Sequence, residues 1–125
     1  MEGEIQNLLE NLKISQASIR DLANLRKLEE IAFPIDRWPL LDLIGVLTIP
    51  GVVRLKAEQR DVFAGFVAGD VRLGKEEGWI TTIAVHPQFR RLGVAGALLD
   101  NCEQLMCVKR IFLTVRKSNL AALSL

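Results

Sequence analysis

The sequence predicts an α/β fold in which helices sandwich a mixed β-sheet, and three observations predict it. Val52 to Glu58 alternates apolar and charged residues, as a half-buried strand does. Val62 to Ala68 and Trp79 to Val85 are short apolar runs typical of central strands. Arg91 to Val108 places its apolar residues on one side, which is typical of an amphipathic helix.

One strand–helix–strand unit makes part of this sheet parallel. The helix Arg91 to Val108 joins the strand Trp79 to Val85 to a predicted strand at Ile111 to Val115, and such a crossover is right-handed in nearly all proteins. The earlier strands are joined by the short connections Gln59 to Asp61 and Asp70 to Gly78, which favour antiparallel pairing. The predicted sheet is therefore antiparallel early and parallel between its last two strands.

A short strand and a helix are predicted before the central strands. Lys13 to Ala17 alternates enough to form a short strand. Ser18 and Asp21 have the spacing of a capping box. The apolar residues that follow recur every three positions, as on one helical face: Ile19, Leu22, Leu25, Leu28 and Ile31. The helix should end near Phe33, because Pro34 disfavours helical geometry in the residue before it.

The remaining segments are shorter. Phe33 to Pro39 is a predicted loop, and Leu40 to Leu47 is a second helix that ends before Pro50 and Gly51. Met1 to Leu12 fits either a short helix or an irregular lead-in, and Ser118 is placed to cap a final helix.

Composition limits the function. With 125 residues, 50% of them hydrophobic, the chain is expected to be a single domain over residues 1–125. Its net charge of +1 argues against a dedicated nucleic-acid or membrane-surface binder. The N-terminus lacks the pattern of a signal peptide, and the apolar stretch Trp38 to Val53 is too short to span a bilayer. With only two cysteines, Cys102 and Cys107, a cytoplasmic location is expected.

The segment from Ile83 to Gly96 carries the chemistry. A strand ends, a short loop follows, and a helix begins whose first N–H groups and dipole favour an anion. Arg90 and Arg91 add positive charge, and Gly93 lets a ligand approach the backbone closely. These features predict a pyrophosphate cradle. The alternative is an ordinary strand–turn–helix with surface arginines.

Two blocks of this sequence resemble the GNAT (GCN5-related) N-acetyltransferases. Arg90-Arg91-Leu92-Gly93-Val94-Ala95 matches the family's Arg/Gln-x-x-Gly-x-Gly/Ala signature, and it follows Ile83-Ala84-Val85-His86-Pro87. Val115 to Ala122 is similar to the family's strand and its Asn-x-x-Ala helix. Gly78 to Val85 and Val115 to Ala122 look most like the protein N-terminal acetyltransferases, including the ribosomal-protein alanine type.

The resemblance implies acetyl-CoA as cosubstrate and no metal. Backbone groups of the strand would bind the pantetheine arm in a wedge between splayed strands, and the loop and helix start would bind the pyrophosphate. The implied cofactor-binding residues are Ile83, Ala84, Val85, Arg90, Arg91, Leu92, Gly93, Val94, Ala95, Gly96 and Asn119. The activity that it implies is acetyl transfer to a primary amine, most closely a protein or peptide N-terminus.

No single sequence motif defines the residues that would bind and activate the acceptor amine. Glu77 is the first candidate for a catalytic base acting through water, followed by Glu76 and Asp36. The alternative for each is a solvated loop acid. Phe33, Asp36 and Trp79 are expected to contact the acceptor.

Departures from the family pattern leave two other functions open. The chain contains no tyrosine, although the family usually places a general-acid tyrosine after the Asn-x-x-Ala segment. We therefore expect a C-terminally incomplete domain that lacks its last two strands. Its open edge beside Phe112 and Thr114 should make the chain unstable, lead to association such as a homodimer, or be completed by a further segment. A small-molecule amine acetyltransferase and a non-catalytic acyl-CoA-binding module are the alternatives.

Overall fold

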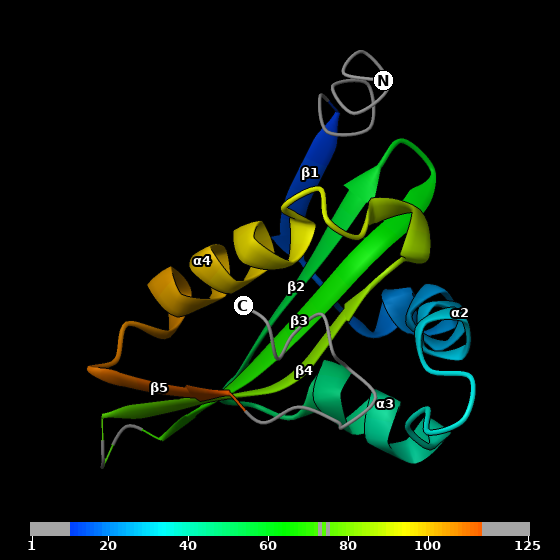
Figure 1. Ribbon diagram of the computed structural model, residues 1–125. Coiled ribbons are helices and arrows are strands. Elements are labelled where there is room, and N and C mark those ends of the chain that lie inside the picture. Colours follow the sequence, from blue (N-terminus) through cyan, green and yellow to red (C-terminus); the bar gives the residue numbers. More distant parts are fainter. Residues whose placement is uncertain (1–10, 73, 75, 114–125) are drawn as a thin grey trace.

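The computed structural model describes residues 11–72, 74 and 76–113 of the chain. Figure 1 labels the helices and strands. In chain order the elements are β1 (Leu12–Gln16), the 3₁₀ turn η1 (Ile19–Asp21), α2 (Leu22–Ala32), α3 (Leu40–Thr48), β2 (Val52–Gln59), β3 (Val62–Arg72), β4 (Glu77–Val85), the 3₁₀ turn η3 (Pro87–Phe89), α4 (Val94–Met106) and β5 (Arg110–Leu113).

The described strands form one five-stranded sheet in the order β1-β2-β3-β4-β5. Neighbours from β1 to β4 are antiparallel, and β4 pairs with β5 in parallel. The helix α4 makes the connection between these two parallel strands (Figure 1). The predicted mixed sheet is confirmed.

Helices cover both faces of the sheet, as predicted. α4 lies on one face, where Leu98 packs with Val67 and Ile80 in one buried cluster. α2 and α3 lie on the other face, where Leu25 packs with Phe66 in a second cluster. Side chains of a strand point alternately to the two faces, so the central strands β3 and β4 contribute to both clusters.

The capping box at Ser18 and Asp21 is confirmed and also joins two elements. The Ser18 N–H donates to the Asp21 carboxylate at 2.8 Å, and the Ser18 hydroxyl accepts from the N–H of Arg20. Asp21 also accepts a hydrogen bond from Lys56 Nζ of β2 at 2.8 Å, and this bond raises the pKa of Lys56. The start of the α2 layer is thereby tied to the sheet.

The structure differs from the prediction at the β3–β4 connection and at the start of α4. The predicted connection Asp70 to Gly78 is mostly strand, because β3 runs to Arg72 and β4 begins at Glu77. Their ladder pairs Arg72 with Glu77, so charged residues that suggested a loop lie at the end of a hairpin. α4 begins at Val94 instead of Arg91, since left-handed backbone at Arg91 and Gly93 is incompatible with a continuous helix.

Membrane-spanning helices and the C-terminal elements were also considered in the sequence-based predictions. In the described part of the chain, no helix combines the length and the apolar character needed to cross a bilayer. The end of the predicted strand at Thr114 and Val115, the predicted helix after Ser118, and Asn119 lie outside the described residues.

Candidate active site

A β-bulge interrupts β4 in the middle of the candidate site. Thr82 pairs with Ala68 of β3, but the next pair toward the start of β4 joins Ile80 to Gly69. Thr81 is therefore the extra residue of a bulge, where a strand bends and twists locally. Such bulges are common beside active sites, where they redirect side chains and backbone groups.

The second half of β4 presents backbone groups at the edge away from β3. The His86 N–H donates to the Ala64 carbonyl of β3 at 2.8 Å. Because backbone groups alternate in direction along a strand, Ala84 also faces β3, while Ile83 and Val85 turn their N–H and C=O groups to the opposite edge. That is the edge at which an extended, amide-containing ligand would add to the sheet.

The structure thus separates the predicted pantetheine-binding residues into two kinds. The backbone groups of Ile83 and Val85 lie at the predicted edge, whereas Ala84 has its side chain buried in the cluster beneath α2 and α3. The described pairing of β5 with β4 runs from Glu77 to Ile80, so it ends before this part of the strand. The predicted splaying of the two strands involves residues beyond Leu113, which lie outside the described part of the chain.

The loop after β4 exposes the first N–H groups of α4. Gly93 has φ of +86° and forms the N-cap of the helix, and the Ala97 N–H donates to its carbonyl at 3.0 Å. The N–H groups of Val94, Ala95 and Gly96 precede that bond, so they have no acceptor within the helix. They are the donors that an anion at this helix start would use.

Two glycines leave space in front of these donors. A Cβ atom built on Gly93 or Gly96 has no neighbouring atom within 4 Å. The left-handed φ of Gly93 explains a glycine there, whereas Gly96 is helical and neither backbone conformation nor packing requires a glycine. An open cradle for a phosphate explains both, so the residues present fit the CoA pyrophosphate.

The two arginines of the loop are exposed, but they differ in their contacts. Arg90 reaches the Val85 carbonyl through Nε at 3.4 Å and the Ala32 carbonyl at the end of α2 through Nη2 at 3.5 Å. Arg91 has φ of +64° and extends the loop toward Leu92, which is half-buried. Both guanidinium groups remain exposed and able to meet a negatively charged ligand.

His86 and Cys102 have structural contacts. The His86 Nδ1 accepts from the Gln88 N–H at 3.1 Å, and its ring meets the ring of buried Phe89 edge to face. Burial raises the pKa of the Cys102 thiol to about 11, which keeps it protonated at neutral pH. Among the described residues, no group of His, Cys, Asp and Glu side chains is arranged as a metal site.

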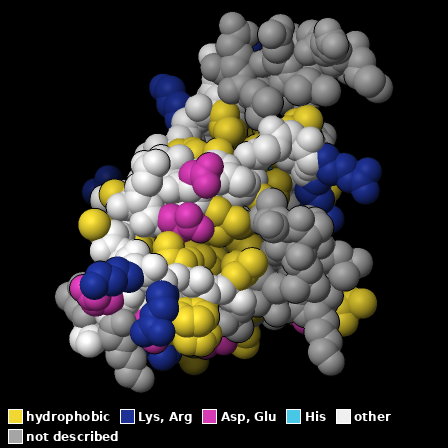
Figure 2. All heavy atoms as spheres, turned by 60° about the vertical axis from the view of Figure 1, so that its left-hand side comes forward, with side chains coloured by type: hydrophobic (Ala, Val, Ile, Leu, Met, Phe, Trp, Pro, Cys, Tyr) yellow, Lys and Arg dark blue, Asp and Glu magenta, His cyan; other side chains and the backbone are white. Residues whose placement is uncertain are grey.

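The candidate bases lie at the other end of β4. Glu77 Oε1 accepts from Arg110 Nη2 of β5 at 3.2 Å, and Glu76 pairs with Lys109 Nζ at 3.0 Å. Figure 2 shows basic and acidic side chains together at this end of the molecule, beside hydrophobic surface. Glu77 is eight residues from Val85, about 26 Å along an extended strand. The structure therefore does not bring the first candidate base to the cofactor loop.

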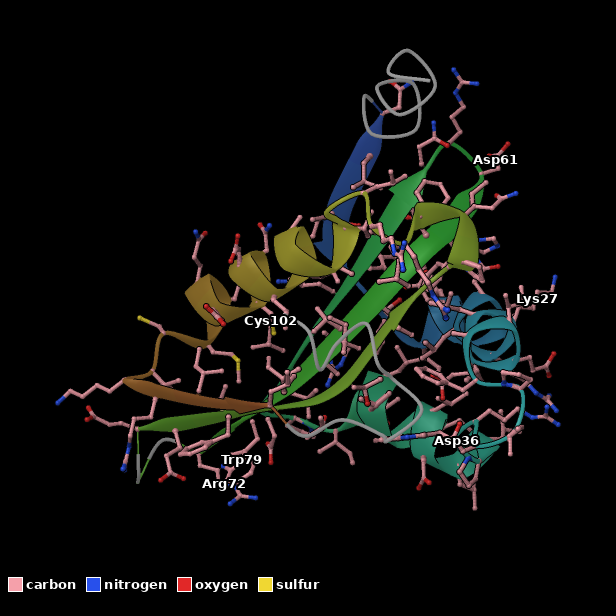
Figure 3. The ribbon with its side chains drawn as sticks, in the orientation of Figure 1. Lys27, Asp36, Asp61, Arg72, Trp79 and Cys102 are labelled. Atoms are coloured by element: carbon pink, nitrogen blue, oxygen red, sulfur yellow. The ribbon has the colours of Figure 1, made fainter. Side chains whose placement is uncertain are left out.

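The three predicted acceptor-binding residues lie apart. Phe33 is 3% exposed and belongs to the buried cluster beneath α2 and α3. Asp36 is exposed in the loop before α3, on the opposite side of Figure 3 from Trp79. Trp79 stacks on Phe112 with 4.6 Å between ring centroids, and the Arg72 guanidinium lies 5.1 Å from the indole centroid.

Two buried polar side chains were not singled out by the sequence reasoning. Glu29 is 1% exposed, and its Oε1 accepts from the Trp38 N–H at 3.0 Å, which holds the loop between α2 and α3. Its position four residues after Leu25, on the apolar face, was the available signal. Thr82 is 4% exposed on β4, and its hydroxyl gives no comparable signal in an apolar, β-branched run.

The geometry of β4 and the loop agrees with a match to a protein family. The model of the acetyltransferase (GNAT) family matches residues 21–125. The chain belongs to this family. It is therefore an acetyl-CoA-dependent N-acetyltransferase, and the predicted family resemblance and enzyme class are confirmed.

Enzymes of known structure that share this fold are named for different acceptors. The ribosomal-protein-S18-alanine N-acetyltransferase from Escherichia coli is 26% identical, with a TM-score of 0.78 over 90% of this chain and 72% of that chain. A ribosomal-protein-alanine N-acetyltransferase from Brucella melitensis is 18% identical, with a TM-score of 0.69 over 90% and 86%. The diaminobutyrate acetyltransferase from Paenibacillus lautus is 21% identical, with a TM-score of 0.75 over 89% and 69%.

Proposed function

We propose that this acetyltransferase acts on the α-amine at the N-terminus of a protein or peptide. The observation that carries the proposal is the similarity, at 26% identity, to an enzyme named for an alanine of a ribosomal protein. The resemblance of Gly78 to Val85 and of Val115 to Ala122 to protein N-terminal acetyltransferases points the same way.

Binding of acetyl-CoA is assigned to the loop and the second half of β4. The N–H groups of Val94, Ala95 and Gly96 would hold the pyrophosphate, with Arg90 and Arg91 supplying positive charge. Acetyl-CoA supplies the activated acetyl thioester. The Val85 N–H, which faces the edge of the sheet, is placed to polarise a thioester carbonyl.

The proposed acceptor limits how much base assistance is needed. In the reaction a C–N bond forms, the C–S bond breaks, and the amine loses one proton. An α-amine has a pKa of about 8, so roughly a fifth is neutral at pH 7.4, whereas only about 0.1% of a lysine amine is neutral. A thiol with a pKa of about 8.5 also leaves without much protonation. An N-terminal acceptor therefore requires only modest proton transfer.

Glu77 stays the predicted base, with a geometric condition attached. The Glu77 side chain is 14% exposed, and its carboxylate is paired with Arg110 at the start of β4. Because the thioester carbonyl is assigned to the Val85 end of β4, a base role for Glu77 requires a chain of water molecules between the two ends of the strand. The rival role for Glu77 is the ion pair itself, which joins β4 to β5.

A small-molecule amine is the second candidate acceptor, because the diaminobutyrate enzyme has the same fold. The test is acetyl-CoA turnover by this chain with a panel of peptides bearing free α-amines, the same peptides with blocked N-termini, and small diamines. We expect turnover with free-amine peptides only. Turnover with diamines and not with peptides would overturn the proposal in favour of a small-molecule enzyme.

A further inference from the structure

Two buried polar atoms of β4 have no hydrogen-bond partner among the residues that the structure describes. They are the Thr82 hydroxyl oxygen and the Trp79 indole nitrogen. Buried polar groups in native proteins are nearly always paired, because an unpaired group loses its hydrogen bonds to water and gains none in return. Two such atoms within four residues of one strand are available to a bound ligand.

The bulge brings these two residues to the same face of the sheet. In a regular strand, residues three apart point to opposite faces. The extra residue Thr81 removes this difference, so Trp79 and Thr82 become neighbours on one face, about 7 Å apart at the rise of two strand residues. This is the face covered by α2 and α3, since Ala68 and Ala84 beside Thr82 both belong to the cluster beneath those helices.

The positions of the Trp79 and Thr82 side chains do not depend on hydrogen bonds between their polar atoms and the described residues. The indole of Trp79 stacks on Phe112 at an interplanar angle of 20°, and the Arg72 guanidinium, labelled beside Trp79 in Figure 3, lies 5.1 Å from the indole centroid. Thr82 is 4% exposed on a strand paired on its β3 side. Within the described part of the chain, packing places both residues, and the hydroxyl and the N–H make no hydrogen bond there.

We propose that the Thr82 hydroxyl and the Trp79 N–H are specificity-determining groups that bind the first residues of an extended peptide acceptor. This inference rests on the proposed function. An indole N–H can only donate, so its partner is an oxygen such as a peptide carbonyl, and not an ammonium group. A hydroxyl both donates and accepts, so it can accept from the acceptor amine or bond the first peptide group.

The direction of the peptide follows from the strand. Thr82 precedes Ile83 and Val85, whose backbone groups face the cofactor edge, whereas Trp79 lies farther from the cofactor loop. The amine of the acceptor peptide is therefore assigned to a position beside Thr82. A carbonyl of the same peptide, about two residues farther along it, is assigned to a position beside Trp79. Hydrogen bonds in a buried site reject analogues that lack the matching group more strongly than apolar contacts do.

The experiment removes each polar atom and keeps the shape. Thr82→Val is the main variant, and Trp79→Phe keeps an aromatic ring without the N–H. Thr81→Val is the matched control, because the Thr81 hydroxyl already contacts the Ala68 carbonyl at 3.4 Å. Thr82→Ser restores a hydroxyl. The readouts are the thermal midpoint, the Kd for CoA, the Kd for a conjugate that joins CoA to a peptide α-amine through an acetyl bridge, and kcat/KM for that peptide.

We expect Thr82→Val to raise the thermal midpoint, because an unpaired buried hydroxyl is removed. The same variant should weaken conjugate binding and lower kcat/KM at least tenfold, with the Kd for CoA unchanged. Trp79→Phe should weaken the conjugate in the same way, and Thr82→Ser should recover most of the loss. Thr81→Val should leave conjugate binding within twofold of the wild type.

Two results would overturn the inference in different ways. If the wild type prefers the conjugate over CoA and Thr82→Val and Trp79→Phe bind it equally well, the two groups do not bind the acceptor, and the proposed function is unaffected. If the wild type binds the conjugate no more tightly than CoA and acetylates diamines instead, the peptide acceptor itself is wrong.

Discussion

The two ends of β4 contribute to the site in different ways. At the C-terminal end, from Ile83 to the start of α4, the contribution comes from backbone groups, and side chains matter mainly by being small. At the N-terminal end, Glu77 and Trp79 contribute side chains whose positions depend on partners from β3 and β5. A backbone site demands special residues at fixed spacing, whereas a side-chain site accepts many residue types. At the cofactor end several positions are therefore expected to affect CoA binding, whereas at the acceptor end the effect should be concentrated in single side chains.

The largest effect in this comparison is expected from Glu77→Gln. If Glu77 activates the acceptor amine, kcat should fall roughly 10- to 1000-fold, the usual range for loss of a general base. The deficit should shrink as the pH approaches 9, because the α-amine is then already neutral. Steady-state rates across pH measure this, with CoA binding unchanged.

Arg110→Gln is the matched control for Glu77, because it breaks the same ion pair and keeps the carboxylate. A base role predicts that only Glu77→Gln changes the pH–rate profile. If both substitutions changed kcat equally and only slightly, the role of Glu77 would be limited to the ion pair with Arg110. Glu76 and Asp36 would then be the candidates for the base.

Gly93→Val should weaken CoA binding more than tenfold, because a branched side chain would fill the open space in front of the helix start. Gly51→Val is the control. Gly51 has φ of +83° and an equally open surround, so backbone strain should be similar in the two variants. Calorimetry with CoA separates the effects, and equal affinities in both variants would remove this loop from the cofactor site.

Gly96→Ala should change stability and binding in opposite directions. Alanine is about 1 kcal/mol more favourable than glycine inside a helix, so the thermal midpoint should rise. The new methyl group projects into the open cradle, so CoA affinity should fall a few-fold. Gly45→Ala in α3 is expected to affect stability without affecting CoA. A Gly96→Ala variant that binds CoA like the wild type would show that the cradle extends no farther than Gly93.

Arg90→Met should have the smallest effect of the four. Much of the pyrophosphate contact is assigned to backbone N–H groups, so the loss in CoA affinity should be less than that of Gly93→Val. The remaining electrostatic part should diminish as salt is added. Arg20→Met is the control for CoA affinity, because it removes an exposed arginine that is distant in sequence from the cofactor loop. A loss larger than that of Gly93→Val would mean that side-chain charge, and not backbone, dominates this end.

The same contrast explains what the sequence could predict. The sequence predicts a cofactor loop because Gly93 and its neighbours follow a strand and open a helix, a local pattern that needs no distant partner. The faces of the strands and α4 followed from their periodicity. The extent of β3 and β4 did not, because charged residues from Asp70 to Gly78 resemble a loop until their pairing across the hairpin is known. The bulge at Thr81 was also hidden, since a bulge is a property of pairing with β3 and leaves no residue signature here.

The bulge also has a consequence for insertions and deletions. Removing one residue from a paired strand normally turns every side chain on one side of the cut to the opposite face. Thr81 is the exception in β4, because it has no opposite residue in β3 and its loss would restore one-to-one pairing. A single-codon deletion at position 81 should therefore keep Ile80 toward α4 and Thr82 toward α2 and α3. Deleting Ile80 instead would bring Thr81 into the place of Ile80, so a hydroxyl would enter the buried cluster beneath α4. At position 81 the strand can lose a residue without changing which side chains face α4 and which face α2 and α3. A deletion scan along β4 should therefore find folded protein for this deletion.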